Sequence, residues 1–389
     1  MAAVSASEVT AIFDEQIVKY PDLAELANEL KTYYSTSLWH QMTDSLMKYV
    51  HSKAFDLTQN EDLLTFYNKL ILRLNNKLNP IKYALVTIAC SRQHENIEDS
   101  IKFLEEAKDR LKNKRDAGYL LDISKAEKKL SLGLHHDCIE ALEVLRVEIE
   151  EMSDVDPKVF SLMAHVFGLY YRRKEDHENY FKSILQYLAY TPMEDLTTKD
   201  KKELSIKVGM SILLGKNVFN IVELLDKELI NSLVGTEFEW LHEMMKTLGK
   251  GEIEAFSHCV RTHNNAITKF PKIVEEMTYL EQKVRIIAFL EMIFQCNKDE
   301  RSIPFSKIAA TCQVEEGDVE FLVMKAMSLG LIRGTIDEVD QVVQVEWSQP
   351  RYLSKDHLKI MGEKMVAWEL KLDETIKMVE ANAQELVVS

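Results

Sequence analysis

Apolar residues recur every three or four positions along most of the chain, from about residue 8 to residue 296. This spacing places them on one face of an α-helix, where a neighbouring helix can cover them. Two helical hairpins are the clearest, and their apolar stripes lie, in chain order, at 118–132, 138–149, 158–171 and 180–188. We therefore expect a mainly α protein that begins with a solenoid of stacked helical hairpins.

A faint internal repeat supports such stacking. Leu214-Gly215-Lys216 and Leu248-Gly249-Lys250 lie 34 residues apart, which is the period of tetratricopeptide repeats. Leu132-Gly133 occupies a similar turn between two stripes. The full tetratricopeptide consensus is absent, so we expect a degenerate, tetratricopeptide-like solenoid in which each Gly triplet lies between a helix and its partner.

The pattern changes after residue 300. A short edge strand is expected at 302–305, followed by two short helices, the second of which begins after Glu315, Glu316 and Asp318. Negative charge at that place is favoured by the helix dipole. This helix should end at Gly330, because glycine readily adopts the left-handed backbone that follows many helices.

Two strands with apolar residues at every second position follow at 331–337 and 341–347, joined by a turn at 338–340. Helix, turn, helix and β-hairpin in this order predict a winged helix. We expect its core, with the turn glycine, to consist of Ile308, Val319, Leu322, Val323, Ala326, Gly330, Ile332, Ile336, Val343, Val345 and Trp347.

The last segment, 354–386, has the pattern of one long helix. Its apolar stripe consists of Leu358, Met361, Met365, Trp368, Leu372, Ile376 and Val379. A helix of roughly 33 residues is about 50 Å long, which exceeds what a winged helix can cover. Partner helices therefore explain the stripe better, although packing against the chain's own core is the competing interpretation.

These patterns divide the chain into four parts. We expect an N-terminal helical-repeat region at 1–190, further helical repeats at 191–296, the winged helix at 297–350 and a C-terminal assembly helix at 351–389. Short polar breaks at 191–200 and 297–302 mark the boundaries.

A helical array that leads through a long helix into a winged helix resembles the PCI domain, which is shared by the proteasome lid, the COP9 signalosome and translation initiation factor three. The stretch 319–340 (VEFLVMKAMSLGLIRGTIDEVD) is especially similar to a subunit of the proteasome regulatory-particle lid. Further matches are Trp347-Ser348-Gln349-Pro350-Arg351, Leu214-Gly215-Lys216-Asn217-Val218-Phe219-Asn220 and Leu38-Trp39-His40-Gln41.

The resemblance implies a structural subunit without catalytic activity, serving ATP-dependent degradation of ubiquitinated proteins. Its implied partners are other PCI and lid subunits, which it meets through the winged helix and a shared bundle of C-terminal helices. A scaffold subunit of the signalosome or of initiation factor three is the alternative. A winged-helix protein that binds nucleic acid is a more remote one.

The charge opposes nucleic-acid binding. The chain has 48 basic and 63 acidic residues, a net charge of −15. Between residues 301 and 347 the count is four basic residues to eight acidic ones, whereas phosphate backbones are held by Lys and Arg. The winged helix is therefore expected to bind protein.

The five cysteines are scattered, with no C-x-x-C pair, which favours a reducing compartment. The N-terminus shows no signal-peptide pattern, and the most apolar run, 286–294, is too short to cross a membrane. We expect a protein of the cytoplasm and nucleus that contacts no membrane and takes no small-molecule substrate.

Candidate chemistry is sparse. Cys259 and His263 are four residues apart, with His258 adjacent, but two ligands do not make a metal site. His135-His136-Asp137 is better explained as a polar turn. The segment 209–217 (GMSILLGKN) departs from a phosphate-binding loop in spacing and lacks the Ser or Thr that holds Mg²⁺. No H-E-x-x-H or G-x-S-x-G motif occurs. We expect no catalytic residue, cofactor or metal.

Overall fold

The computed structural model describes residues 13–14, 17, 23–50, 64, 66–71, 78–94, 96–111, 114–152, 154–225, 228–296, 301–349 and 355–382. The chain forms two compact units, Met1–Asp195 and Leu196–Ser389. The boundary between them falls within the polar break at 191–200. The finer division into four parts stays a prediction, and residues 297–300 of the second break lie outside the described chain.

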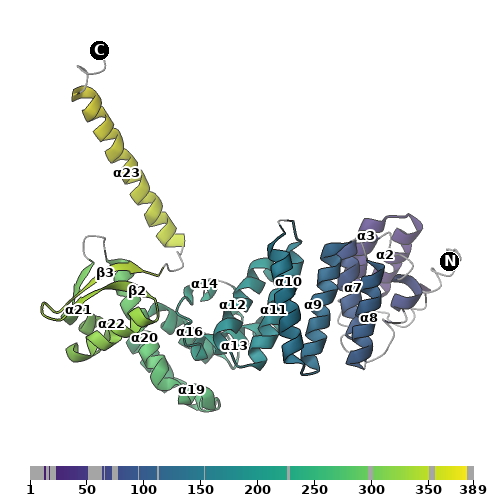
Figure 1. Ribbon diagram of the computed structural model, residues 1–389, viewed down its shortest axis with the longest axis horizontal. Helices are drawn as coiled ribbons and strands as arrows, with labels where there is room; N and C mark the ends of the chain where they lie inside the picture. The colour runs from purple at the N-terminus through teal and green to yellow at the C-terminus, as the bar shows by residue number, and fades with distance from the viewer. Residues whose placement is uncertain are drawn as a thin grey trace. The chain divides into compact units, whose positions relative to one another are not determined.

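The first unit is built from helices that pack on their neighbours in sequence. They are α2 (Ala24–Ser35), α3 (Trp39–Val50), the π-helix η2 (Tyr67–Ile71), α7 (Pro80–Ser91), α8 (Ile97–Arg110), α9 (Arg115–Ser131), α10 (His135–Glu150), α11 (Pro157–Arg173), α12 (His177–Tyr190) and the short η3 (Met193–Asp195). In Figure 1 the helices from α7 to α11 lie side by side. The predicted hairpins α9–α10 and α11–α12 are both present, and the helical-repeat fold is confirmed.

Local sequence explains where several of these helices begin. The Asp156 carboxylate accepts a hydrogen bond from the Lys158 amide at 2.9 Å, and Pro157 occupies the first turn, where its missing N–H costs nothing. Asp176 accepts from the Asn179 amide at 3.1 Å in the same way. The predicted stripes then face inward, as the burial of Leu142 and Val166 shows.

The second unit begins with helices and ends in the winged helix. Its elements are α13 (Thr198–Leu214), α14 (Val222–Leu225), α15 (Glu228–Asn231), α16 (Glu239–Lys250), α17 (Ile253–Thr262), α18 (Asn264–Ile267), α19 (Pro271–Glu275), α20 (Met277–Gln295), β1 (Ser302–Pro304), α21 (Phe305–Cys312), η5 (Glu316–Asp318), α22 (Val319–Ser328), β2 (Ile332–Asp337), β3 (Val342–Ser348) and α23 (Lys355–Asn382). The segment resembling a phosphate-binding loop lies largely in α13, as a buried helix end.

The two Gly triplets do not occupy equivalent positions, which corrects the repeat interpretation. Gly215 follows the last residue of α13, whereas Gly249 is buried inside α16. The turn after α16 is made two residues later by Gly251, whose φ is +69°. Short helices and irregular chain follow α13 in place of a long partner helix, so the 34-residue spacing does not mark a structural repeat here.

The winged helix has a three-stranded antiparallel sheet in the order β1-β3-β2. The predicted edge strand and hairpin are present, with Pro304 at the end of an edge strand, where its missing N–H is tolerated. Helices α21 and α22 pack beside the sheet (Figure 1). Gly330 has φ +69° directly after the last turn of α22, as the helix-end pattern predicts.

Helix α20 leads into the winged helix and carries a fully buried lysine. The Lys283 ammonium donates hydrogen bonds of 2.7 Å to the carbonyl oxygens of Ile212 and Gly215, at the C-terminal end of α13. It also lies 5.7 Å from the centre of the Phe219 ring. These carbonyls have no partner within their own helix, so Lys283 ties α20 to the end of α13.

Burial lowers the pKa of Lys283 to about 7, from an ordinary value near 10.5. The unfolded chain therefore binds more protons than the folded chain between these two pH values. Stability attributable to this residue should rise with pH across that window, by at most about 1.4 kcal/mol per pH unit. Below pH 7 both states hold the proton, and the contribution becomes constant.

We expect the wild-type chain to gain stability relative to Lys283→Met as the pH is raised from 7 to 9. Urea unfolding at both pH values measures this difference. Lys202→Met serves as the control, since Lys202 lies exposed on α13. Parallel pH profiles for wild type and Lys283→Met would show that Lys283 is protonated throughout.

We expect Gly251→Ala to destabilise the second unit by on the order of 2–4 kcal/mol. Alanine is strained at positive φ, and its Cβ would lie 2.7 Å from the backbone nitrogen of Ala288 on α20. Gly317→Ala is the matched control, because Gly317 is exposed and no atom lies within 4 Å of the position that the new methyl group would take. Thermal unfolding followed by circular dichroism compares the two, and equal melting temperatures would refute the close approach to α20.

Candidate protein-interaction surfaces

Most of the expected winged-helix core is buried. The fully buried members are Ile308, Val319, Val323, Ala326, Ile332, Val343 and Val345. Leu322 and Ile336 are half-buried, and Gly330 is exposed. Ile303, Phe305 and Leu331 are also buried. They lie within the expected strands but were not among the expected core residues, because a strand of four residues and the first residue of a strand show little alternation.

Trp347 is not a core residue, which corrects the prediction from strand alternation. Its side chain is 38% exposed, and the Arg333 guanidinium lies over the indole at 5.0 Å from the ring centre. A register shift between Arg333 and Gly334 places Arg333 opposite Trp347 on the neighbouring strand. A cation–π contact thus takes the place of packing against apolar core residues.

The second helix of the winged helix presents apolar side chains to solvent. Phe321 on α22 is 65% exposed, and Met324, one turn later, is exposed as well. The helix begins after Glu316 and Asp318, whose side chains are exposed and acidic. An apolar surface with acidic residues at its start suits contact with protein and opposes contact with phosphates.

Helix α23 exposes every side chain that the structure describes on it, namely residues 358–359 and 361–379. All seven members of the predicted stripe are among them, with Trp368 63% exposed. Val366, Leu370 and Met378 are exposed outside the stripe. None of these described side chains is buried against the chain's own core. Ser354 and residues 383–386 of the predicted helix lie outside the described residues.

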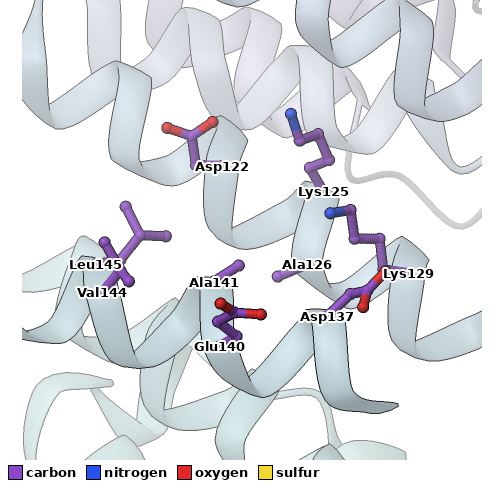
Figure 2. A pocket seen from close by; sticks show the side chains of 9 residues that line it. All are labelled: Asp122, Lys125, Ala126, Lys129, Asp137, Glu140, Ala141, Val144 and Leu145. Atoms are coloured by element: carbon purple, nitrogen blue, oxygen red, sulfur yellow. The ribbon is translucent and has the colours of Figure 1, made fainter. Parts of the chain in front are cut away.

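A shallow groove lies between α9 and α10 in the first unit (Figure 2). Its floor is apolar, with Ala126, Ala141, Val144 and Leu145. Charged residues of both signs surround it, namely Asp122, Lys125, Lys129, Asp137 and Glu140. Lys125 also pairs with Glu105 at 2.9 Å. The groove thus combines an apolar floor with a rim of mixed charge.

One cluster of potential metal ligands forms where α16 meets α17. His263 Nε2 lies 2.9 Å from Glu243 Oε2, and Cys259 Sγ lies 4.0 Å from the same oxygen. Sequence spacing brought out Cys259 and His263 but missed Glu243, because the fold supplies it from another helix. Burial, together with the nearby Glu243 carboxylate, raises the pKa of the Cys259 thiol to about 11. His136, from the other candidate, is exposed and lies 3.7 Å from Glu140.

Known protein families match most of the chain. A family model described as PSD13 N-terminal repeats matches residues 26–245, and one described as PCI domain matches residues 260–347. The 26S proteasome non-ATPase regulatory subunit 13 homolog A of Arabidopsis thaliana is 32% identical over 95% of this chain and 97% of that protein. The chain belongs to the family of 26S proteasome non-ATPase regulatory subunit 13.

Other members of the subunit 13 family match a similar share of the chain, at somewhat lower sequence identity. The Dictyostelium discoideum subunit 13 is 30% identical over 94% of this chain and 95% of that protein, and the 26S proteasome regulatory subunit RPN9 of Saccharomyces cerevisiae is 25% identical over 95% of each. The resemblance drawn from residues 319–340 is thereby confirmed. Similarity to the Dictyostelium eukaryotic translation initiation factor 3 subunit M is lower, 19% over 57% of this chain and 53% of that protein.

The names of these subunit 13 relatives describe regulatory, non-ATPase subunits. Among the described residues of this family member, no helix is both long and apolar enough to cross a membrane. The surfaces that the structure offers for contact with other proteins are the exposed apolar side chains of α22 and of the described part of α23.

Proposed function

We propose that this chain is a non-catalytic scaffold subunit of the proteasome regulatory-particle lid and that α23 is the element by which it enters the complex. The observation that carries this proposal is the exposure of all seven stripe residues on a helix of 28 residues. A helix that exposes such a stripe in the isolated chain gains stability when partner helices cover it.

The energy available from that surface is large. Covering seven apolar side chains of this size could contribute on the order of 10–20 kcal/mol before costs. Loss of translational freedom and ordering of side chains then subtract much of this sum. Assembly should therefore tolerate one truncation in the stripe and fail when several central residues become charged.

The winged helix is proposed as a second contact surface. Phe321 and Met324 offer apolar area at its rim, and the adjacent acidic residues discourage nucleic acid. We infer that it packs against the winged helix of another PCI subunit. The proposal places the chain in the cytoplasm and nucleus, with no cofactor and no small-molecule substrate.

A scaffold role in another PCI complex is the competing proposal. Five relatives with proteasome names match 92–95% of the chain, whereas two initiation factor 3 relatives match 54–57% of it. This difference favours the proteasome. Affinity purification from the native organism followed by mass spectrometry distinguishes proteasome, signalosome and initiation factor by the proteins that co-purify.

We expect joint replacement of Met365, Trp368 and Leu372 by Glu to leave a folded, helical chain that no longer assembles. The three side chains already face solvent, so their replacement removes no packing within this chain. Circular dichroism and co-purification with other lid subunits are measured on the same preparation.

The charge-matched control is joint replacement of Lys364, Lys371 and Lys377 by Gln, which changes the net charge by the same −3 outside the stripe. It should assemble like wild type. Normal assembly of the Glu variant would move the site of assembly elsewhere, with the winged helix as the first place to examine. Its unfolding would mean that α23 belongs to the chain's own core.

A further inference from the structure

Glu243, Cys259 and His263 form a three-residue cluster at one end of the α16–α17 hairpin. Their potential ligand atoms all lie within 4.8 Å of one another. The fold explains the meeting. Glu243 lies eight residues before Gly251 and Cys259 eight residues after it. The two residues are therefore at equal distances from the turn that joins α16 to α17, and they lie opposite each other on the two helices. His263 follows Cys259 by one helical turn and therefore lies on the same face.

We propose that this cluster binds a zinc ion through Cys259 Sγ, a ring nitrogen of His263 and a carboxylate oxygen of Glu243, with water as the fourth ligand. Zinc takes this combination of sulfur, nitrogen and oxygen in tetrahedral sites, and a three-residue set leaves one position for water. Magnesium and calcium are disfavoured because they prefer oxygen ligands alone.

Two of the three distances differ little from those of a tetrahedral ion, and the third, between Cys259 and His263, lies within 4.8 Å. Zinc–ligand bonds of about 2.0–2.3 Å require ligand atoms about 3.4–3.6 Å apart. The present separations from Glu243 Oε2 are 2.9 Å to His263 Nε2 and 4.0 Å to Cys259 Sγ. Both differ from the tetrahedral value by about half an ångström. The Glu243 side chain is about half exposed, so it can rotate by that amount without disturbing the core.

Exposure and charge allow the same assignment, with the ion displacing a thiol proton whose pKa burial has raised. Cys259 is buried and fixes the inner end of the site, whereas Glu243 and His263 are open to solvent and leave a path for the ion and its water. Binding converts the thiol to a thiolate and releases one proton to solvent. A divalent ion then meets one thiolate, one carboxylate and a neutral imidazole, so the site has no net charge.

An ion held in this way would cross-link α16 to the end of α17. The two helices already pack together, and Gly251 in their connecting turn approaches α20 closely. The zinc site would therefore stiffen the helical part of the second unit. It does not depend on the proposed scaffold role and can be tested separately from it.

The test uses the full-length chain under reducing conditions, titrated with Co²⁺ as a spectroscopic substitute for Zn²⁺. We expect one equivalent to bind, with a thiolate-to-metal absorption in the near ultraviolet and visible bands of a tetrahedral ion, and Zn²⁺ should displace it. Cys259→Ser should abolish the thiolate band. The variant keeps the other four cysteines, Cys90, Cys138, Cys296 and Cys312, so loss of the band assigns it to Cys259.

Glu243→Gln and His263→Gln should each weaken binding at least about tenfold, the smaller loss seen when even an outer partner of a metal site is removed. The matched control is His258→Gln, because His258 adjoins Cys259 but is exposed and outside the cluster. It should bind like wild type. Circular dichroism verifies that each variant is folded, and the exposed Glu243 gives a test that leaves the core intact.

Absence of the thiolate band in the wild-type chain would overturn the proposal and leave only an ion pair between His263 and Glu243. A band that persists in Cys259→Ser would overturn it equally, because another cysteine would then hold the metal. Unchanged affinity in both Glu243→Gln and His263→Gln would reduce the site to a single thiol, which is not the site proposed.

Discussion

An amphipathic helix gains most of its stability when another element covers its apolar face, and this requirement organises the helices that precede α23. In the first unit each helix covers its neighbour, so that Leu142 on α10 and Val166 on α11 are both fully buried. In the second unit α20 takes the central place, with its apolar residues buried from Leu280 to Ile293. Most helical stability in such an arrangement comes from packing and little from intrinsic propensity.

A buried charge enters this packing at a place where the backbone leaves carbonyl oxygens without a donor. Lys283 lies in the buried face of α20 because the end of α13 presents carbonyl oxygens that need donors. The pairing fixes α20 against α13, and α20 in turn positions the winged helix that follows it. The same requirement for cover is not met at α23. That helix carries an apolar stripe as long as those of the core helices, and the part of the chain that the structure describes leaves the stripe exposed.

The spacing of apolar residues predicts those features of the fold that depend on a single helix or strand. The helices α9 to α12, the winged helix and the long C-terminal helix all follow from three- and four-residue spacing and from strand alternation. Properties that depend on two elements were missed. Gly249 looked like a turn residue because the sequence cannot show that Gly251 is the position with a positive φ. Trp347 looked buried because a register shift in the paired strand leaves no trace in its own strand.

The candidate metal site illustrates the same limit. Cys259 and His263 are visible as a pair because they lie one turn apart on one helix, whereas Glu243 joins them only through the fold of the α16–α17 hairpin. The stripe on α23 is the opposite case: its residues could be named from the sequence, but only the structure shows that the described side chains are exposed. The proposed function of this protein thus rests on the apolar side chains that the fold leaves exposed.

Hydrogen–deuterium exchange of α23 tests this account most directly, comparing the isolated chain with the chain in an assembled lid. Amides of an uncovered helix open locally at little cost, whereas those of a packed helix open only with the surrounding structure. We predict fast exchange across 355–382 in the isolated chain and strong protection after assembly, with α20 protected in both. Protection of α23 in the isolated chain equal to that of α20 would contradict the account, because the helix would then already be covered.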